Sequence, residues 1–371
     1  MRSSEELFWA FPRTDQSRRT SNLTLSESCG VIHFHALKAQ YLDGRDTPPR
    51  ARECSRHLTI QRMRFVLKLV LMVVLAACPL SVLHAQDLAP RAYVITPVHS
   101  NAVLITWSFY DGGVNFNGTI PVTNATGTYY LSIFSYYHSL NFFGRSANIT
   151  AVLPYAVGNF QGDLAGQSRS VYRSGLADSG FRFSVNLIGG PAMQAREMAK
   201  WKQKRLLGLS LRMVAPTGQY SGTKLINWGG NRWAFKPELG YSERRGHWLL
   251  DGYAGGWFYT TNQEFFAGAV TKPQNESPIL SLEGHLSYDV RPRLWLSVDG
   301  NFWWGGVTSL SGIQNLATKQ TGSRIGGTVS FPISKHQSIK ASYSNGTYIS
   351  FGGNYQNVSV AWQYSWLGRP N

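Results

Sequence analysis

The chain of 371 residues contains very little cysteine, and it contains none after residue 78. The three cysteines are Cys29, Cys54 and Cys78. Neither a disulfide nor a cysteine-ligated metal can therefore stabilise the remaining residues. No other ligand motif is apparent, so we expect no metal and no cofactor.

Charged residues are also scarce, at 15% of the chain. Glycine and the aromatic residues are abundant instead, with 37 Gly, 12 Trp, 18 Tyr and 19 Phe. A chain rich in strand-forming aromatics and poor in the Glu and Lys of helix surfaces favours an all-β protein. Its length alone would allow one large domain or two or three smaller ones.

Acidic residues are few compared with basic ones. Residues 86–371 contain 24 Lys and Arg against 13 Asp and Glu, a net charge of +11. Such a charge suits nucleic acid, an anionic membrane surface or an anionic solute. Only residues 196–205, REMAKWKQKR, form a dense basic run. Because nucleic-acid binding usually needs a richer basic helix or arm, we do not expect nucleic acid as a partner.

Long apolar runs are missing after residue 85, since no eighteen consecutive residues are apolar. Residues 63–85, MRFVLKLVLMVVLAACPLSVLHA, combine a basic start, an apolar run and small residues. This layout predicts a secretory signal peptide that is cleaved near Ala85. The alternatives are an uncleaved membrane anchor and a lipoprotein signal at Cys78, for which the following Pro79 is unfavourable.

The residues before Met63 are polar and arginine-rich, and they lack helical or strand periodicity. A signal peptide has to lie at the N-terminus to be recognised. We therefore expect translation to begin at Met63, with residues 1–62 as a mis-assigned start or an unstructured extension. The main body is then residues 86–371.

Alternation of apolar with polar or small residues recurs throughout this body. Residues 357–366, NVSVAWQYSW, are a clear example. Twelve such runs predict strands, most of them ten to thirteen residues long, which is enough to cross a bilayer on a tilt. The predicted strands are 103–110, 128–138, 145–156, 179–188, 206–215, 231–242, 247–259, 279–290, 293–304, 321–333, 336–346 and 356–366.

The connections between these runs alternate between long and short. Those after the sixth, eighth and tenth runs are very short, whereas every connection after an odd-numbered run is long. This predicts a transmembrane antiparallel β-barrel of about 12 strands, of the outer-membrane type. Residues 189–205 break the rule, and their REMAKWKQKR part predicts a short amphipathic helix, as a periplasmic flap or at the barrel mouth. A secreted β-sandwich or β-solenoid is the soluble alternative.

The last strand predicts how the barrel meets lipid. Val358, Val360, Trp362, Tyr364 and Trp366 share one face, and a barrel that crosses a bilayer turns its apolar face outward. We expect this strand to pair with the first, and the barrel-insertion machinery to recognise it, although five residues follow it. The predicted partners are outer-membrane lipid, that machinery and a small-molecule solute.

Three motifs carry a resemblance to a known family. They are PTGQY at residues 216–220, NRW at 231–233 and KPE at 236–238, within residues 214–242. With the surrounding sequence over nearly all of residues 90–366, they resemble the outer-membrane "transporter" family associated with the meta-cleavage pathway of phenol degradation. The resemblance implies a barrel linked to uptake of aromatic or other hydrophobic small molecules, and it implies no catalytic residues.

The polar faces of the strands predict a charged lumen. Its bases lie mainly on the fourth to sixth and tenth to eleventh strands, and its acids on the seventh to ninth. Two opposed walls would orient a dipolar solute and steer anions, which suggests passive, weakly anion-preferring passage of small aromatic acids with residues 228–233 at the entrance. The alternative is a plugged barrel, structural or adhesive, in which these charges pair. The predicted lumen residues are Arg182, Arg212, Arg232, Lys236, Glu238, Asp251, Glu283, His285, Asp289, Asp299, Arg324 and Lys340.

His285 and Ser287 suggest one further alternative, a membrane-embedded lipid hydrolase with the histidine as base and the serine as nucleophile. Side chains two residues apart on a strand stand about 6.5–7 Å apart, which is long for a direct hydrogen bond. We therefore expect ordinary lumen polarity here and not an enzyme.

Overall fold

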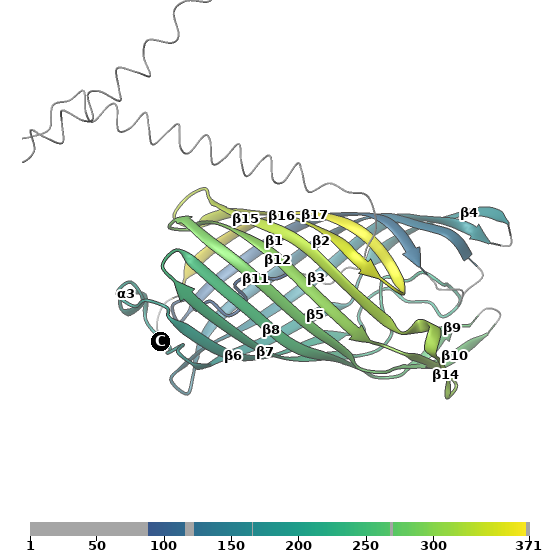
Figure 1. Cartoon of the computed structure of the whole chain (residues 1–371), viewed down its shortest axis with the longest axis horizontal. Coiled ribbons are helices and arrows are strands. Elements are labelled where there is room, and N and C mark those ends of the chain that lie inside the picture. Colours follow the sequence, from purple (N-terminus) through teal and green to yellow (C-terminus); the bar gives the residue numbers. More distant parts are fainter. Residues whose placement is uncertain (1–87, 116–121, 165, 268–269, 369–371) are drawn as a thin grey trace, which may run out of the picture. The chain divides into compact units, whose positions relative to one another are not determined.

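The computed structural model describes residues 88–115, 122–164, 166–267 and 270–368 (Figure 1). The predicted signal peptide and the predicted extension before it lie outside the described residues. Everything below concerns the described part of the chain.

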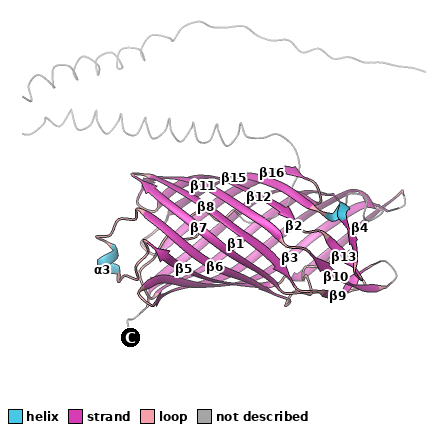
Figure 2. Ribbon diagram, turned by 60° about the horizontal axis from the view of Figure 1, so that its bottom comes forward, coloured by secondary structure: helices cyan, strands magenta, loops and turns pink. Residues whose placement is uncertain are grey.

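Twelve tilted strands form one closed antiparallel barrel (Figures 1 and 2). Neighbours in sequence pair with each other around the ring, and β1 pairs with β17 to close it. Each of the twelve predicted strands coincides with one of these, so the predicted fold is confirmed. The barrel strands are β1 (Ser100–Asn115), β2 (Val122–Phe142), β3 (Arg145–Leu164), β5 (Ser179–Ile188), β6 (Arg205–Ala215), β7 (Ala234–Arg245), β8 (Trp248–Tyr259), β11 (Ile279–Arg291), β12 (Leu294–Gly305), β15 (Gln320–Pro332), β16 (Gln337–Ile349) and β17 (Gly352–Leu367).

The alternation along β17 separates an outer face from an inner face as predicted. Val358 and Trp362 are exposed on the outside, whereas Asn357 and Ala361 are buried. Trp362 lies opposite Ile105 of β1, which is also exposed. Since lipid offers no hydrogen-bond partners, this closed ring with an apolar outer surface satisfies its backbone internally.

The long connections lie at one end of the barrel and contain more regular structure than predicted. β4 (Gln167–Leu176) extends the hairpin of β3 beyond the ring (Figure 1). Two other connections contribute a small separate sheet, because their polar segments pair with each other outside the apolar band. This sheet consists of β9 (Asn262–Phe266), β10 (Thr271–Glu276), β13 (Thr308–Leu310) and β14 (Ile313–Asn315), and η1 (Leu316–Thr318) follows it.

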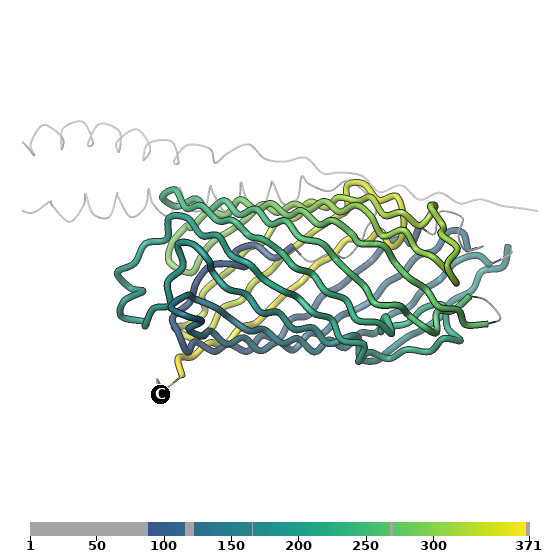
Figure 3. The backbone as a smooth tube through the Cα atoms, turned by 90° about the horizontal axis from the view of Figure 1, so that it is seen from below, coloured from purple at the N-terminus to yellow at the C-terminus, as the bar shows by residue number. Residues whose placement is uncertain are grey.

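The other end carries the short turns, the end of β17 and the connection between β5 and β6 (Figure 3). In outer-membrane barrels this end is periplasmic. The predicted helix in that connection is shorter than expected, because only α3 (Ala195–Met198) is helical and Trp201 then packs onto the barrel end. Among the described residues, no helix combines the length and apolar character needed to cross a membrane.

A lipid-facing substitution should be costly. Val298 of β12 is 58% exposed on the outer face. We expect Val298→Arg to lower the free energy of unfolding by about 2–4 kcal/mol, because the charge would lie in the apolar band. Urea unfolding in lipid vesicles measures this. Ile313→Arg, at an exposed position of the small sheet, is the control and should have almost no effect. Equal losses in both variants would contradict the lipid-facing assignment.

Candidate functional site

Residues 88–99, which precede β1, run inside the barrel, and we call them the inner segment. Two backbone N–H groups fasten it to β8: that of Arg91 donates to the Asp251 carboxylate at 3.3 Å, and that of Ala92 donates to the Tyr253 hydroxyl at 3.0 Å. The Arg91 side chain also forms an ion pair with Asp289 at 2.8 Å. The lumen is therefore partly filled by the inner segment, which the sequence did not predict.

Tyr93 of the inner segment is almost completely buried, at 1% exposure. Its ring lies against Gly208 of β6 and Gly240 of β7, which are directly opposite each other in the sheet. A Cβ at Gly208 or Gly240 would come within 2.2 or 2.0 Å of the ring. These glycines are needed for this close approach.

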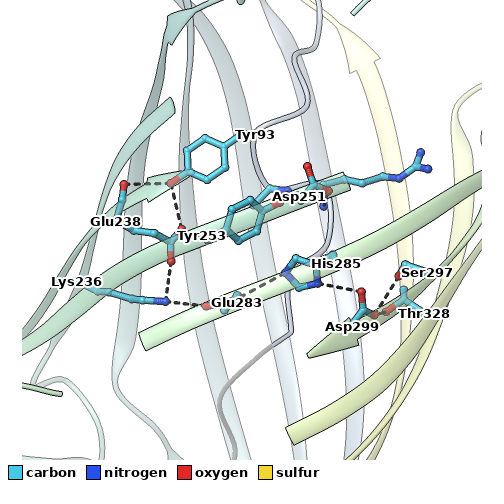
Figure 4. A network of polar contacts seen from close by, with 12 residues as sticks. Tyr93, Lys236, Glu238, Asp251, Tyr253, Glu283, His285, Ser297, Asp299 and Thr328 are labelled. Carbon is cyan, nitrogen blue, oxygen red and sulfur yellow. Dashed lines mark hydrogen bonds and ion pairs between the residues drawn. The ribbon is translucent and has the colours of Figure 1, made fainter. Parts of the chain in front are cut away.

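Hydrogen bonds hold the other end of the same side chain. The Tyr93 hydroxyl lies 2.9 Å from the hydroxyl of Ser210. It also lies 3.1 Å from the carboxylate of Glu238 (Figure 4). The Arg182 guanidinium lies 4.8 Å from the ring centroid, a cation–π contact. Tyr93 is thus fixed by shape at its ring and by polar contacts at its tip.

A belt of alternating charge lines the wall beside the inner segment. Lys236 lies between Glu238, at 2.7 Å, and Glu283, at 2.8 Å (Figure 4). His285 continues the belt, with Nε2 3.7 Å from Glu283 and Nδ1 2.9 Å from Asp299. Lys236 is thus flanked on both sides by a carboxylate, which compensates its buried charge.

The Asp299 carboxylate ends this belt by accepting hydrogen bonds from the Ser297 and Thr328 hydroxyls. At the other end, Arg182 lies 3.8 Å from Glu238. Arg212 lies directly opposite Arg182 in the sheet. The belt therefore extends from β5 across to β15.

The remaining predicted lumen residues lie apart from the belt. Asp289, near the periplasmic end, pairs with Arg244 as well as with the inner segment. Arg324 is 3% exposed and donates to the Ser344 hydroxyl at 2.8 Å. Lys340 is half-buried on β16. The inner face therefore brings most of the predicted residues together, while their role in solute passage stays a prediction.

Arg232 lies at the extracellular end and not in the barrel wall. It forms an ion pair with Glu276 and lies 4.3 Å from the Tyr259 ring centroid. Burial raises the pKa of the Glu276 carboxyl above its ordinary value, and the Arg232 charge opposes that shift. The ion pair between Arg232 and Glu276 therefore joins the small sheet to the extracellular end of the barrel.

A small void remains between the inner segment and strands β12 to β17. Its volume is about 60 Å³. Leu88 borders it on one side, and Asp299 and Arg324 are among the wall residues. The void is large enough to hold water.

Aromatic residues gather in the extracellular half of the lumen. The Tyr110 and Tyr129 rings stack at 4.5 Å, and Tyr355 meets Tyr129 edge-on at 5.0 Å. Trp228, from the connection between β6 and β7, lies 5.6 Å from Tyr129 and 5.7 Å from Phe160. We call these five residues the aromatic cluster. The inward parity of Tyr110 and Tyr355 could have indicated it, although their contacts could not.

The histidine and serine considered for hydrolysis do not form a catalytic pair. The His285 ring binds Asp299, and the Ser287 hydroxyl has no hydrogen-bond partner among the described residues. Both side chains are buried inside the barrel, away from the lipid face. This arrangement does not supply a base next to a nucleophile.

The connection between β5 and β6, at the periplasmic end, packs against the part of the inner segment nearest β1. We call this contact the clamp. Ile95 is buried against Met193 and Leu206, and Met198 and Trp201 pack around them. The backbone N–H of Val98 donates to the Met193 carbonyl at 2.9 Å. The connection that broke the predicted loop rule therefore holds the inner segment in place.

Loosening this clamp should make the inner segment more mobile. We expect Trp201→Ala to weaken its seating by about 1–2 kcal/mol, because only part of the indole is buried. Hydrogen exchange of the inner-segment amides should then be faster. Phe143→Ala, at a fully exposed aromatic of a turn at the same end, should leave exchange unchanged. Equal protection in the wild type and in Trp201→Ala would contradict the clamp.

Comparison with known proteins confirms the predicted family. Residues 111–349 match the model of a protein family whose description is "Putative MetA-pathway of phenol degradation". No curated protein sequence shows significant similarity to this chain.

Several solved structures of outer-membrane proteins superimpose on this chain, to different degrees. An outer-membrane channel from Pseudomonas putida F1 superimposes with a TM-score of 0.63 at 15% identity, covering 76% of this chain and all of that one. The transport unit of the autotransporter AIDA-I from Escherichia coli gives 0.44 at 12% identity, covering 76% of this chain and 93% of that one. The toluene transporter TbuX of Ralstonia pickettii superimposes with a TM-score of 0.33 at 10% identity, covering 74% of this chain and 90% of that one. Only the first likeness is strong enough to support the fold.

Proposed function

This chain belongs to the family of the MetA pathway of phenol degradation, and from that premise we propose that it is an outer-membrane barrel for passive uptake of small hydrophobic and aromatic molecules, including anionic ones. The observation that carries the proposal is the aromatic cluster at the extracellular end of the lumen. Flat rings such as these favour offset or edge-on contact with another flat ring.

The rest of the lumen wall suits passage more than a packed core. Its buried side chains are mostly small and polar, and such a wall can remain hydrated when the inner segment moves. The buried serines of the barrel wall include Ser108, Ser135, Ser184, Ser210, Ser242, Ser281, Ser287 and Ser297.

A solute would follow a simple route through this barrel. It would leave the aromatic cluster, pass the inner segment and continue along the side of β12 to β17, where Arg324 gives the wall a positive group. Because the void there is about 60 Å³, passage of a ring requires the inner segment to shift. The inner segment is thus the main resistance on the route.

Solute discrimination in proteoliposomes tests the proposal. At pH 7, labelled phenylacetate is ionised and crosses bare lipid slowly, and labelled xylose is a comparably small polar control. The wild type should take up phenylacetate faster than xylose. Tyr110→Ala should lower this ratio, whereas Tyr130→Ala, on the lipid face, should not. Uptake of neither solute above protein-free vesicles would refute the proposal.

A non-conducting structural barrel is the second candidate, and the filled lumen favours it. In that case the ion pairs around Lys236 would serve stability alone. The vesicles just described would then take up phenylacetate no faster than lipid without protein.

A further inference from the structure

A second pocket lies at the extracellular end, between β4 and the connection from β6 to β7. Its volume is about 480 Å³, within the range of small-molecule sites. One wall is β4, with Tyr172, Arg173 and Ser174. The other is the connection between β6 and β7. That wall contributes Gln219, Tyr220, Ser221, Lys224, Ile226, Asn227 and Trp228.

The charge of this pocket is of one sign. Within the described residues, its lining contains two bases, Arg173 and Lys224, and no acid. The Arg173 side chain donates to the Ile226 carbonyl at 3.1 Å and to the Tyr172 carbonyl at 3.0 Å. Its described partners are thus uncharged, and its positive charge is not neutralised by a carboxylate. An anion would be attracted here.

The pocket wall is built before any ligand arrives. The Asp178 carboxylate accepts the backbone N–H groups of Gly218 at 2.8 Å and Gly230 at 2.7 Å. Further along, the Asn227 side-chain carbonyl accepts the N–H of Ser221 at 2.9 Å, and its amide donates to the Lys224 carbonyl at 2.8 Å. A connection fixed in this way loses little conformational freedom on binding.

The pocket is also aromatic, and it adjoins the lumen. Tyr220, from the connection between β6 and β7, contributes an aromatic residue to the lining. Trp228 lines the pocket and belongs to the aromatic cluster at the same time. Its indole N–H is buried without an acceptor among the described residues.

We propose that this pocket is an extracellular binding site for small aromatic carboxylates. Arg173 and Lys224 neutralise the carboxylate, and the rings of Tyr220 and Trp228 contact the aromatic body. This binding site specifies which class of solute the proposed uptake function would serve. Its physiological purpose therefore rests on that proposed function. Binding itself does not require transport.

Binding of labelled 2-naphthoate to the folded, detergent-solubilised barrel, measured by equilibrium dialysis, tests the proposal. We expect saturable binding that weakens about fivefold or more in Arg173→Gln and in Lys224→Gln, because each removes one charge near the carboxylate. Arg169→Gln is the matched control, since Arg169 is exposed on the same strand and outside the pocket lining. It should bind as the wild type does.

Two competitors separate the possible ligand chemistries. 2-Naphthamide, which keeps the ring and lacks the charge, should compete at least tenfold more weakly than unlabelled 2-naphthoate. Inorganic phosphate and lipopolysaccharide should compete poorly. If both displaced the probe as well as 2-naphthoate does, the site would be a general anion or lipopolysaccharide site and the proposal would be wrong.

The proposal also fails if 2-naphthoate does not bind, or if it binds equally to the wild type and to both glutamine variants. Lys224 is exposed, so Lys224→Gln keeps this test valid even if Arg173→Gln disturbs the connection. Binding with no uptake into vesicles would refute the proposed function and leave the site intact. Uptake with no binding would refute the proposed site and leave the proposed uptake function intact.

Discussion

A barrel that lacks residues 88–96 should conduct ions severalfold better than the wild type in planar bilayers. The deletion removes the part of the inner segment that contacts Asp251, Tyr253 and Glu238, and it leaves all twelve strands. Conductance rises with the open cross-section, and a ring of this strand number encloses a wide interior. Single-channel recording gives the result directly.

Deleting part of an outer connection is the matched control for this experiment. Removal of residues 311–314, which form the turn after β13 and most of β14, shortens the chain away from the lumen. Its conductance should match that of the wild type. If the inner-segment deletion conducted no better than this control, the inner segment would not be the main resistance in the lumen.

Lys236→Met should destabilise the barrel strongly. Lys236 is 6% exposed and lies within 2.8 Å of two carboxylates, so its loss removes the nearest countercharge of both. Glu238 then keeps only the more distant Arg182, at 3.8 Å, and Glu283 keeps only His285, at 3.7 Å. Breaking a buried ion pair in this way costs about 3–5 kcal/mol. The free energy of unfolding in urea should fall by that amount.

Two further variants show whether the charge is responsible. Lys272→Met removes an exposed lysine of β10 and should leave stability unchanged. Adding Glu283→Gln to Lys236→Met should recover part of the loss, because one of the two facing charges is then removed. A Lys236→Met barrel as stable as the Lys272→Met barrel would show that this part of the belt carries no net stabilisation.

The strands could be predicted from the sequence because a lipid-crossing sheet imposes a strict period of two. β5 is predicted to the residue, and the outward set of β17 follows from parity alone. The ends of β2 and β3 could not be predicted. These strands continue past the apolar band, where alternation no longer has to separate lipid from lumen.

The filling of the lumen could not be predicted, since its contacts join residues far apart in the chain. Residues 88–99 show no periodicity, and Tyr93 reaches Glu238 across 145 positions. Gly208 and Gly240 are visible as glycines within strands, but nothing in the sequence indicates which side chain they accommodate. Charges such as Lys236 and Glu283 could be placed on the inner face, whereas their pairing required the register between strands.

The uptake rate of labelled phenylacetate in Gly240→Ala proteoliposomes tests the central claim, that the inner segment controls passage through the lumen. A Cβ at this position would come within 2.0 Å of the Tyr93 ring, so the side chain must leave its seat without any deletion from the chain. Gly252→Ala is the matched control, because a Cβ there meets no atom within 4 Å. We expect Gly240→Ala to take up phenylacetate severalfold faster than the wild type and Gly252→Ala to match the wild type. Equal rates in all three, or no uptake in any, would contradict the claim.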